Sequence, residues 1–273
     1  MNLRFALNHM TAPQLDLRSF FALARALGIT DVEIRNDVAG QAILDTPPAA
    51  VRDMAAAAGV NILTINALQR FNDWSAARAT EAATLASFAR GCGAAALILV
   101  PTNDSSSLAD GQRQASLRAA LRALAPLLED HNITGLVEPL GFKTCSLRSK
   151  REAVDAIVEA GGERVFRLTH DTFHHHLAGE PDLFPDQTGL VHISGVVDSA
   201  VGVAGMRDAH RVLVDARDRI GNLEQIDALR GAGYHGPFSF EPFAAELRTL
   251  ADPARALRDS MEFIGAELAS KAA

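Results

Sequence analysis

The sequence is poor in cysteine and in aromatic residues, and it lacks a long apolar run. Among its 273 residues are two cysteines, one tryptophan and one tyrosine. Because Cys92 and Cys145 do not form the dense cysteine pattern of a secreted disulfide scaffold, we expect both to be reduced thiols. No stretch reaches the roughly 20 apolar residues that span a bilayer, and the first residues lack the basic start and apolar run of a signal peptide. We therefore expect a cytoplasmic protein that does not enter membranes.

Basic residues are too few to suggest a nucleic-acid-binding surface. The 26 lysines and arginines are outnumbered by 33 acidic residues, which gives a formal net charge of −7. Attraction to phosphate backbones or anionic lipids needs clustered basic side chains, so we predict no nucleic-acid partner. The apolar fraction of 48% fits a folded domain with a sizeable core, and the length matches the roughly 250 residues of one α/β barrel. The sequence leaves open whether the chain forms a homo-oligomer.

Short apolar runs alternate with longer stretches in which apolar residues recur every three or four positions. The first pattern predicts buried parallel strands, and the second predicts amphipathic helices. The predicted strands are Leu3–Asn8, Asp31–Arg35, Asn61–Ala67, Ala95–Pro101, Ile133–Pro139, Val165–Asp171, Leu190–Ser194 and Pro237–Glu241. The predicted helices are Leu15–Leu27, Pro47–Ala58, Ser75–Arg90, Leu108–Asp130, Lys150–Ala160, Leu223–Ala232 and Pro253–Leu268, with only a brief candidate at Glu180–Phe184 after the sixth strand.

The order of these elements predicts a closed barrel. Glycines follow several predicted helices, where a left-handed residue ends a helix at little cost, namely Gly28, Gly59, Gly93, Gly161 and Gly233. Helices between successive strands force parallel crossovers, and eight such units close more naturally into a barrel than into an open sheet. An open doubly wound sheet is the alternative, but its Gly-x-Gly-x-x-Gly sequence after the first strand is absent. We predict an α/β fold, a single (β/α)8 TIM barrel forming one domain over residues 1–273.

Four predicted strands end in side chains that could bind a metal ion together. Chemistry in α/β barrels gathers at the carboxyl ends of the strands, where this sequence has Glu138, Asp171, His192 and Glu241. Three converging carboxylates would repel one another, and a divalent cation removes this cost. An oxygen-rich set with one imidazole suits Mn²⁺, Zn²⁺, Co²⁺ or Mg²⁺, in contrast to a structural zinc site, which prefers thiolates.

Each of these four residues also has an ordinary structural interpretation. Glu138 and Glu241 could be solvated carboxylates that cap the next helix, and Asp171 could be a helix N-cap. His192 alone would more often be a hydrogen-bonded core histidine than a ligand. The matching Glu-Pro endings of two strands, and the shared position of all four residues, favour the metal site.

Three consecutive histidines follow the sixth predicted strand. If the segment is extended, His174 and His176 share one side and His175 faces the other. We predict that His174, three residues after Asp171, belongs to the functional site. The other two are expected to be surface residues or to lie behind the site.

Taken in order along the chain, these residues resemble those of the xylose-isomerase-like barrels. That family includes inosose isomerases and dehydratases, sugar 3-epimerases and hydroxypyruvate isomerases, and the resemblance covers nearly the whole chain. Its parts are Asp-Val-Glu-Ile-Arg at 31–35, Asn-Ala-Leu at 66–68 followed by Phe71-Asn72, Glu138 with Gly141 and Cys145, Asp-Thr-Phe-His at 171–174, the strand containing His192, His210-Arg211-Val212, and Gly233-Tyr234 leading into Ser-Phe-Glu-Pro-Phe at 239–243. The segment 66–72 is most similar to the 2-keto-myo-inositol isomerases.

The resemblance implies a role for each candidate residue. The four strand-end residues would bind one divalent metal ion, and Glu138 and Glu241 would also form the proton-transfer pair. His174 would contact a substrate oxygen, and Asn66 and Arg211 would be further substrate contacts. The implied substrate is a small polyol ketone or ketose, and the implied reaction moves a carbonyl group to the neighbouring carbon.

This assignment is chemically coherent. The reaction removes a proton next to a ketone, passes through an enediolate, and returns the proton one carbon away. A metal ion and a hydrogen bond from His174 would stabilise the developing negative charge. Arg211 could anchor a hydroxyl group or close the rim, although it could also be a surface arginine paired with Asp208 or Asp215.

Two segments near the predicted site depart from the family pattern, and both bear on the choice of substrate. Relatives often have an aspartate shortly after the histidine of the seventh strand, where this chain has Ser194-Gly195, and Asp198 is a candidate replacement. The Pro-Gly-x-Gly segment of relatives is replaced by Leu-Val-Asp-Ala-Arg at 213–217. We predict a long loop at Gly195–Gly205 beside the site.

Other functions remain open at this point. An inosose dehydratase, a ketose 3-epimerase or a hydroxypyruvate isomerase would use the same residues. The DNA-repair endonucleases of the family need more histidines and a basic face, which this acidic chain lacks. A sugar-binding barrel without catalysis is an alternative of another class, and the presence of both glutamates argues against it.

Overall fold

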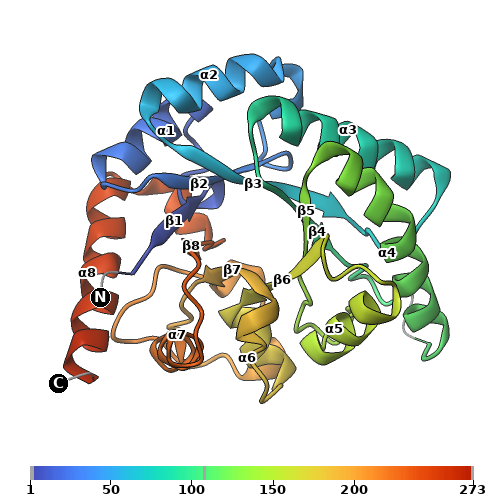
Figure 1. Ribbon diagram of the computed structural model, residues 1–273. Coiled ribbons are helices and arrows are strands. Elements are labelled where there is room, and N and C mark those ends of the chain that lie inside the picture. Colours follow the sequence, from blue (N-terminus) through green and yellow to red (C-terminus); the bar gives the residue numbers. More distant parts are fainter. Residues whose placement is uncertain (1–2, 107–108, 272–273) are drawn as a thin grey trace.

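Eight parallel strands close into a barrel in the computed structural model, which describes residues 3–106 and 109–271 (Figure 1). Each strand pairs with the next along the chain, and the last pairs with the first. The strands are β1 (Phe5–Asn8), β2 (Asp31–Arg35), β3 (Asn61–Gln69), β4 (Ala96–Val100), β5 (Thr134–Val137), β6 (Phe166–Asp171), β7 (Thr188–Ile193) and β8 (Phe238–Phe240). The predicted TIM barrel is therefore confirmed, and the open doubly wound alternative is wrong.

A helix follows each strand and packs on the outside of the barrel (Figure 1). The helices are α1 (Leu17–Ala26), α2 (Pro48–Ala58), α3 (Ala76–Cys92), α4 (Gln112–His131), α5 (Lys150–Glu159), α6 (Thr172–Ala178), α7 (Asn222–Gly231) and α8 (Pro253–Lys271). Gly59 and Gly93 end α2 and α3 in the left-handed conformation, with φ of 69° and 81°. The predicted start of the fourth helix, Leu108, lies outside the described residues. Within the described part of the chain, no helix is long and apolar enough to cross a membrane.

The structure corrects the helix predicted after the sixth strand. Residues 180–184 are not helical, and α6 instead begins directly after β6. Asp171 starts this helix, because its carboxylate accepts hydrogen bonds from the backbone N–H groups of Phe173 and His174 at 2.8 and 3.0 Å. The prediction at Glu180–Phe184 is therefore wrong, and the histidine run is helical rather than extended.

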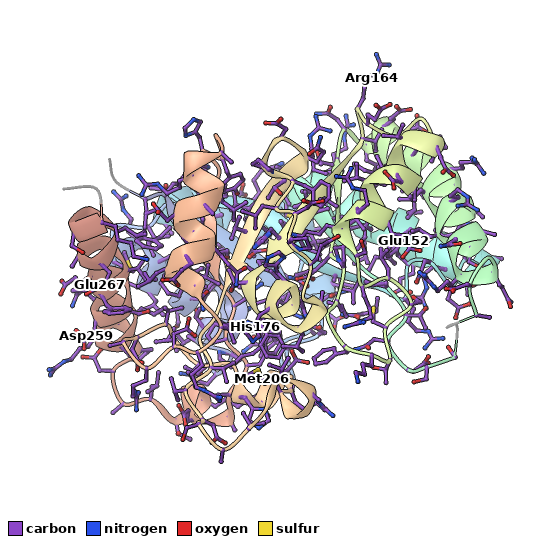
Figure 2. The ribbon with its side chains drawn as sticks, turned by 90° about the horizontal axis from the view of Figure 1, so that it is seen from below. Glu152, Arg164, His176, Met206, Asp259 and Glu267 are labelled. Carbon is purple, nitrogen blue, oxygen red and sulfur yellow. The ribbon has the colours of Figure 1, made fainter. Side chains whose placement is uncertain are left out.

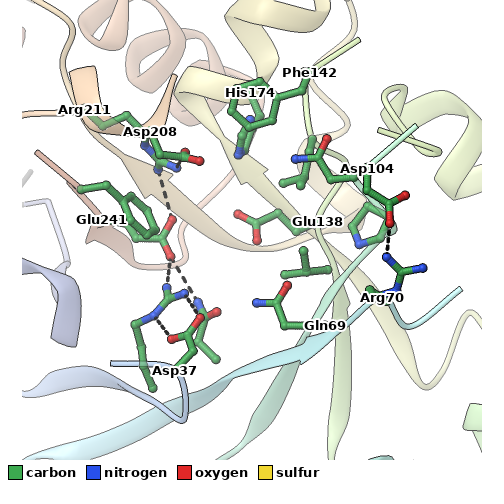
Figure 3. Close-up of a pocket in the computed structure, with 17 residues that line it drawn as sticks. Asp37, Gln69, Arg70, Asp104, Glu138, Phe142, His174, Asp208, Arg211 and Glu241 are labelled. Atoms are coloured by element: carbon green, nitrogen blue, oxygen red, sulfur yellow. Dashed lines mark hydrogen bonds and ion pairs between the residues drawn. The ribbon is translucent and has the colours of Figure 1, made fainter. Parts of the chain in front are cut away.

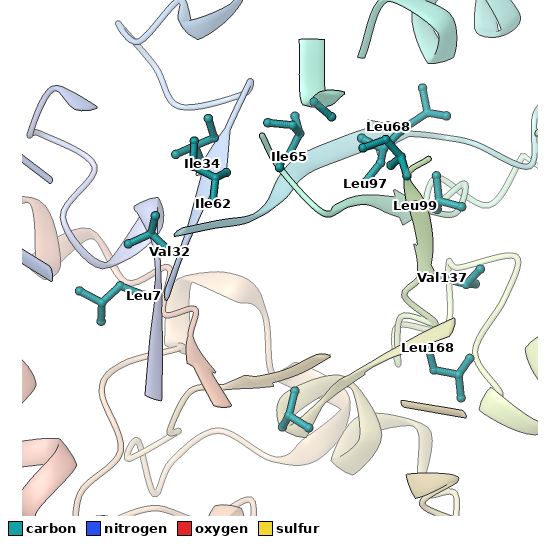
Figure 4. Packing of buried hydrophobic residues seen from close by; sticks show 14 of the residues in the cluster. Leu7, Val32, Ile34, Ile62, Ile65, Leu68, Leu97, Leu99, Val137 and Leu168 are labelled. Atoms are coloured by element: carbon teal, nitrogen blue, oxygen red, sulfur yellow. The ribbon is translucent and has the colours of Figure 1, made fainter. Parts of the chain in front are cut away.

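Most of the apolar core lies between the barrel and its helices. Leu97 and Leu99 of β4 belong to this outer cluster (Figure 4), whereas Ala96 and Ile98 of the same strand belong to a separate small cluster. This division follows from the strand itself, because successive side chains point to opposite faces. Charged side chains on the outer helices, such as Glu267 on α8, point away from the core (Figure 2).

A long irregular segment, residues 194–221, connects β7 to α7 and includes the predicted loop after β7. It returns to the barrel mouth where Gly195 and Val212 exchange backbone hydrogen bonds of 2.8 and 2.9 Å. This antiparallel bridge fixes the residue before Val212, which is Arg211, at the carboxyl ends of the strands.

Candidate metal centre and adjoining pocket

Four side chains from four different strand ends meet in the mouth of the barrel. Glu138 follows β5, Asp171 ends β6, His192 lies in β7, and Glu241 follows β8. Each offers one possible ligand atom, and these atoms all lie within 4.8 Å of one another. All four residues are buried. The structure therefore brings together the four residues that the sequence predicts as metal ligands.

Strand pairing explains why these residues meet. Asp171 of β6 lies opposite His192 of β7, which in turn lies opposite Ser239 of β8. Glu241 is two residues beyond Ser239, so its side chain returns to the same face. The imidazole Nδ1 of His192 lies 2.9 Å from Glu138 Oε1, 3.1 Å from Glu241 Oε2 and 3.9 Å from Asp171 Oδ2. One ring nitrogen therefore faces all three carboxylates.

The other ring nitrogen of His192 faces a fourth carboxylate. Its Nε2 lies 3.1 and 3.2 Å from the two oxygens of Glu33 on β2, which is fully buried. Burial alone would lower the pKa of His192, but the charges of Glu241, Glu33 and Glu138 raise it well above its ordinary value. Burial is the largest single effect on Glu33 and would raise its pKa, but the charge and hydrogen bond of His192 together with the hydrogen bond from Ser239 lower the pKa overall.

Glu241 is held by more hydrogen bonds than the other carboxylates of the cluster. Its Oε1 accepts from Arg35 Nη1 at 2.6 Å, from Asn8 Nδ2 at 3.1 Å and from Asn66 Nδ2 at 3.2 Å. Its Oε2 accepts from Arg211 Nη2 at 3.1 Å. Burial would raise the pKa of Glu241, but His192 and the two arginines lower it overall.

Glu138 has few partners by comparison. In the described residues its only side-chain hydrogen-bond partner is His192. Burial therefore dominates and raises the pKa of Glu138, with the nearby charges of Glu241 and Asp171 acting in the same direction and His192 opposing them. The two glutamates thus occupy matching places after their strands but have opposite pKa shifts.

Arg211 is buried and joins two of the carboxylates. Its Nη2 donates to Asp171 Oδ2 at 2.6 Å as well as to Glu241, and its Nε donates to Ser194 Oγ at 2.9 Å. Only 1% of Arg211 is exposed, so it is not a surface arginine, although it does contact Asp208 at 3.3 Å. Ser194 begins the segment in which relatives often have an aspartate. In this chain its hydroxyl accepts the hydrogen bond from Arg211.

The charges of this cluster do not balance by themselves. Four buried carboxylates, those of Glu33, Glu138, Asp171 and Glu241, are accompanied by two buried guanidinium groups, those of Arg35 and Arg211. With a neutral imidazole, two of the four negative charges have no guanidinium charge to balance them. A divalent cation beside Nδ1 would compensate this charge and take the place of a proton on that nitrogen. The donor set therefore fits a divalent metal ion.

A pocket of about 370 Å³ opens beside the cluster of four strand-end residues (Figure 3). Glu138, Glu241, Arg211 and Asn66 line it, together with His174. Phe142 and Phe173 pack edge-on against the His174 ring, with centroid distances of 5.1 and 5.2 Å. A pocket of this size accommodates a small polar molecule in contact with the carboxylates.

Most of the sequence-predicted contacts lie at this pocket, and one candidate does not. Asn66 is in the pocket wall, where its amide also donates to Glu241. His175 and His176 are half-buried in α6 and do not line the pocket, as predicted. Asp198 is exposed and accepts a hydrogen bond from the Ala200 backbone, so it does not replace the aspartate of relatives.

Sequence reasoning assigned no role to three residues that shape the site. Glu33 and Arg35 come from β2, and Asn8 comes from β1. A signal was present, because two charged side chains in a strand expected to be buried on both faces need partners. Their partners, His192 and Glu241, lie about 160 and 210 residues away along the chain and are brought near only by barrel closure.

Comparison with known proteins agrees with this architecture. The sequence model described as xylose isomerase-like TIM barrel matches residues 21–266. The chain belongs to this family. A solved structure of a xylose isomerase domain-containing protein from Salmonella typhimurium LT2 is 34% identical, with a TM-score of 0.89 over 98% of this chain and 99% of that one. The resemblance inferred from the sequence is thus confirmed at the level of the family.

Solved structures with lower sequence identity share the fold. The IolI protein, solved with a bound zinc atom, is 18% identical with a TM-score of 0.84, over 98% of this chain and 99% of that one. An L-ribulose 3-epimerase is 20% identical with a TM-score of 0.73, over 98% and 95% of the two chains. A comparison with curated protein sequences gave no match.

Proposed function

We propose that this protein is a divalent-metal-dependent isomerase that moves a carbonyl group between adjacent carbons of a polyol ketone of the 2-keto-myo-inositol type. The observation that carries the proposal is the convergence of Glu138, Asp171, His192 and Glu241 on one point, where two of them, Glu138 and Glu241, also line a substrate-sized pocket. The zinc atom bound to the related IolI protein supports a metal ion in this fold.

In the proposed reaction, the four strand-end residues hold the metal ion and two of them also handle protons. When bound, the ion supplies the positive charge that makes the proton next to the ketone acidic. Glu138 and Glu241 contribute one carboxylate each to the pocket wall, so one can accept the proton and the other can return it one carbon away. The enediolate formed between these two proton transfers is the charged intermediate that the site must stabilise.

His174 is suited to contact a substrate oxygen. It lines the pocket, and its ring packs edge-on against two phenylalanines, which hold it in place. We therefore propose that a substrate oxygen is hydrogen-bonded by the pocket side of this ring. Asn66 and Arg211, which also line the pocket, would contact substrate hydroxyl groups while keeping Glu241 in place.

The test begins with metal analysis of the purified protein, followed by NMR of inososes and free ketoses incubated with it in deuterated water. We expect one divalent ion per chain and deuterium at a carbon next to the carbonyl. A moved carbonyl identifies the isomerase, whereas inversion of one carbon identifies an epimerase and loss of water identifies a dehydratase. Binding of a ketone without any deuterium incorporation would reject catalysis and favour a sugar-binding barrel.

Removing the metal ion gives a second test. We expect a chelator to abolish deuterium incorporation, and added Mn²⁺, Co²⁺, Zn²⁺ or Mg²⁺ to restore it. The bound ion should also stabilise the fold by about 2.7 kcal/mol when its concentration is about 100 times its Kd. Thermal unfolding with and without the ion measures this effect. Equal melting temperatures in both conditions would contradict a metal ion at this cluster.

A further inference from the structure

We propose that Glu33 is the positioning residue of the metal centre, which fixes His192 with Nε2 protonated and Nδ1 turned toward the three candidate ligand carboxylates. This inference rests on the proposed metal-dependent function. It assigns a role to a buried carboxylate that would not itself touch the ion or the substrate.

Glu33 is held rigidly by neighbouring strands. Its Oε2 accepts a 2.7 Å hydrogen bond from Thr64 Oγ1 on β3, and its Oε1 accepts a 2.5 Å hydrogen bond from Ser239 Oγ on β8. Asn8 Nδ2 on β1 makes a longer contact of 3.4 Å with Oε1. Neighbouring strands thus fix both oxygens of Glu33 independently of His192. The Nε2 of His192 is a further contact of both oxygens.

The placement of Glu33 requires a compensating interaction. Its side chain is 0% exposed, and in the part of the chain that the structure describes it forms no ion pair with a lysine or arginine. Neutral donors such as Thr64 and Ser239 satisfy part of its hydrogen-bonding capacity, but a fully buried charge is costly unless it is also paired with a positive group or a further donor. The N–H of His192 Nε2 is the donor that reaches both oxygens, at 3.1 and 3.2 Å.

This contact decides which nitrogen of His192 can bind a cation. An ionised carboxylate only accepts hydrogen bonds, so the nitrogen facing Glu33 must carry a proton. In the neutral ring the lone pair is then on Nδ1, which lies 2.9 Å from Glu138 and 3.1 Å from Glu241. A carboxylate behind a histidine ligand fixes its tautomer and ring orientation and increases its basicity, and loss of such a partner typically weakens metal binding about 10- to 100-fold.

The experiment measures Zn²⁺ affinity and the tautomer of His192 in the full-length protein. We expect Glu33→Gln to bind Zn²⁺ about 10- to 100-fold more weakly than the wild type in competition with a chelator. Long-range ¹H–¹⁵N NMR of the histidine-labelled, metal-free wild type, recorded at alkaline pH where the ring is neutral, should show His192 protonated only on Nε2. In metal-free Glu33→Gln under the same conditions the ring should lose this single-tautomer signature.

Two further variants make the result specific. Ser239→Ala removes one hydrogen bond that holds Glu33 and should give an intermediate loss of affinity. It also carries the test if Glu33→Gln fails to fold. Asp31→Asn removes another buried carboxylate of β2, which pairs with Arg4 and not with the centre, and should bind Zn²⁺ as the wild type does.

The outcomes separate this inference from the proposed function. If the wild type binds Zn²⁺ and turns over substrate while folded Glu33→Gln keeps the same affinity and the same tautomer, the role of Glu33 is rejected and the isomerase proposal stands. If the wild type itself binds no divalent ion, the proposed function fails first. A loss of affinity in Asp31→Asn equal to that in Glu33→Gln would show a general charge effect and also reject the positioning role.

Discussion

Glu138 and Glu241 have matching positions, each after a strand and before a proline, yet their surroundings differ. Glu241 accepts hydrogen bonds from four side chains, those of Asn8, Arg35, Asn66 and Arg211. Glu138 has His192 as its only side-chain hydrogen-bond partner within the described ranges. Burial raises the pKa of Glu138, whereas for Glu241 the effect of burial is outweighed by His192 and the arginines, and the pKa falls. The fold thus stabilises the charge of one glutamate and disfavours that of the other.

The largest effect is expected when Glu241 loses its charge. In Glu241→Gln the new amide N–H₂ must face Arg35 or Arg211, which are donors as well, so one buried guanidinium loses one of its acceptors. We expect the free energy of unfolding of the metal-free protein to fall by about 3 kcal/mol. Removal of one partner of a buried ion pair typically costs about 3 to 5 kcal/mol. Urea unfolding in the presence of a chelator measures this change.

Turnover should fall together with stability in this variant. A proton-transfer group contributes about 10²- to 10⁴-fold to rate, and loss of a ligand adds to that effect. We expect the rate of deuterium incorporation at saturating metal to fall by more than about 10³-fold. If Glu241→Gln unfolds with the same free energy as the wild type, the four hydrogen bonds that Glu241 accepts do not stabilise its charged carboxylate.

Glu138→Gln should separate the two effects. The substitution removes a carboxylate that burial and neighbouring charges disfavour, and it disturbs only the contact to His192. We expect the metal-free variant to be at least as stable as the wild type, while the rate of deuterium incorporation falls by about 10²- to 10⁴-fold. Urea unfolding and the NMR exchange assay measure the two quantities on the same sample.

The pair of variants therefore tests the comparison directly. If Glu138→Gln destabilises the metal-free protein as much as Glu241→Gln does, the two glutamates are equivalent in the fold and the asymmetry has no energetic meaning. If Glu138→Gln keeps wild-type turnover, proton transfer does not pass through this residue. If the protein is a sugar-binding barrel without catalysis, Glu138→Gln should bind an unreacted ketone with the same affinity as the wild type.

The fold was predictable from the sequence because its signals are local. Apolar runs, helical periodicity and glycines such as Gly59 and Gly93 each depend on a few neighbouring residues, and eight repeats of the pattern leave little choice but a closed barrel. The helix after β6 is not predicted, because it begins with a side-chain cap from Asp171, a residue that the sequence offers both as a possible N-cap and as a possible ligand. In the structure its carboxylate caps α6 and also lies in the four-residue cluster.

The site was predictable in part, for the same reason. Strand-end positions identify Glu138, Asp171, His192 and Glu241, since every strand of a parallel barrel delivers its last residues to one face. The partners that give each residue its properties are not encoded by position. Sequence gives no indication that the buried charge of Glu33 meets His192, because that contact depends on register and closure of strands far apart in the chain.

The smallest expected effect concerns the pocket rim, where charges are exposed. Arg211 contacts Asp208 at 3.3 Å, but the Asp208 side chain is 48% exposed, in contrast to the buried Asp171 and Glu241 that the same arginine also contacts. Solvent-exposed ion pairs typically contribute about 0 to 1 kcal/mol, so Asp208→Asn should change the free energy of unfolding by less than about 1 kcal/mol. Urea unfolding at low and high salt measures this change and its screening. If Asp208→Asn lowers the free energy of unfolding as much as Glu241→Gln is expected to, Arg211 is held mainly by exposed Asp208 and not by buried Asp171 and Glu241. The contrast between Glu138 and Glu241 would then need another cause.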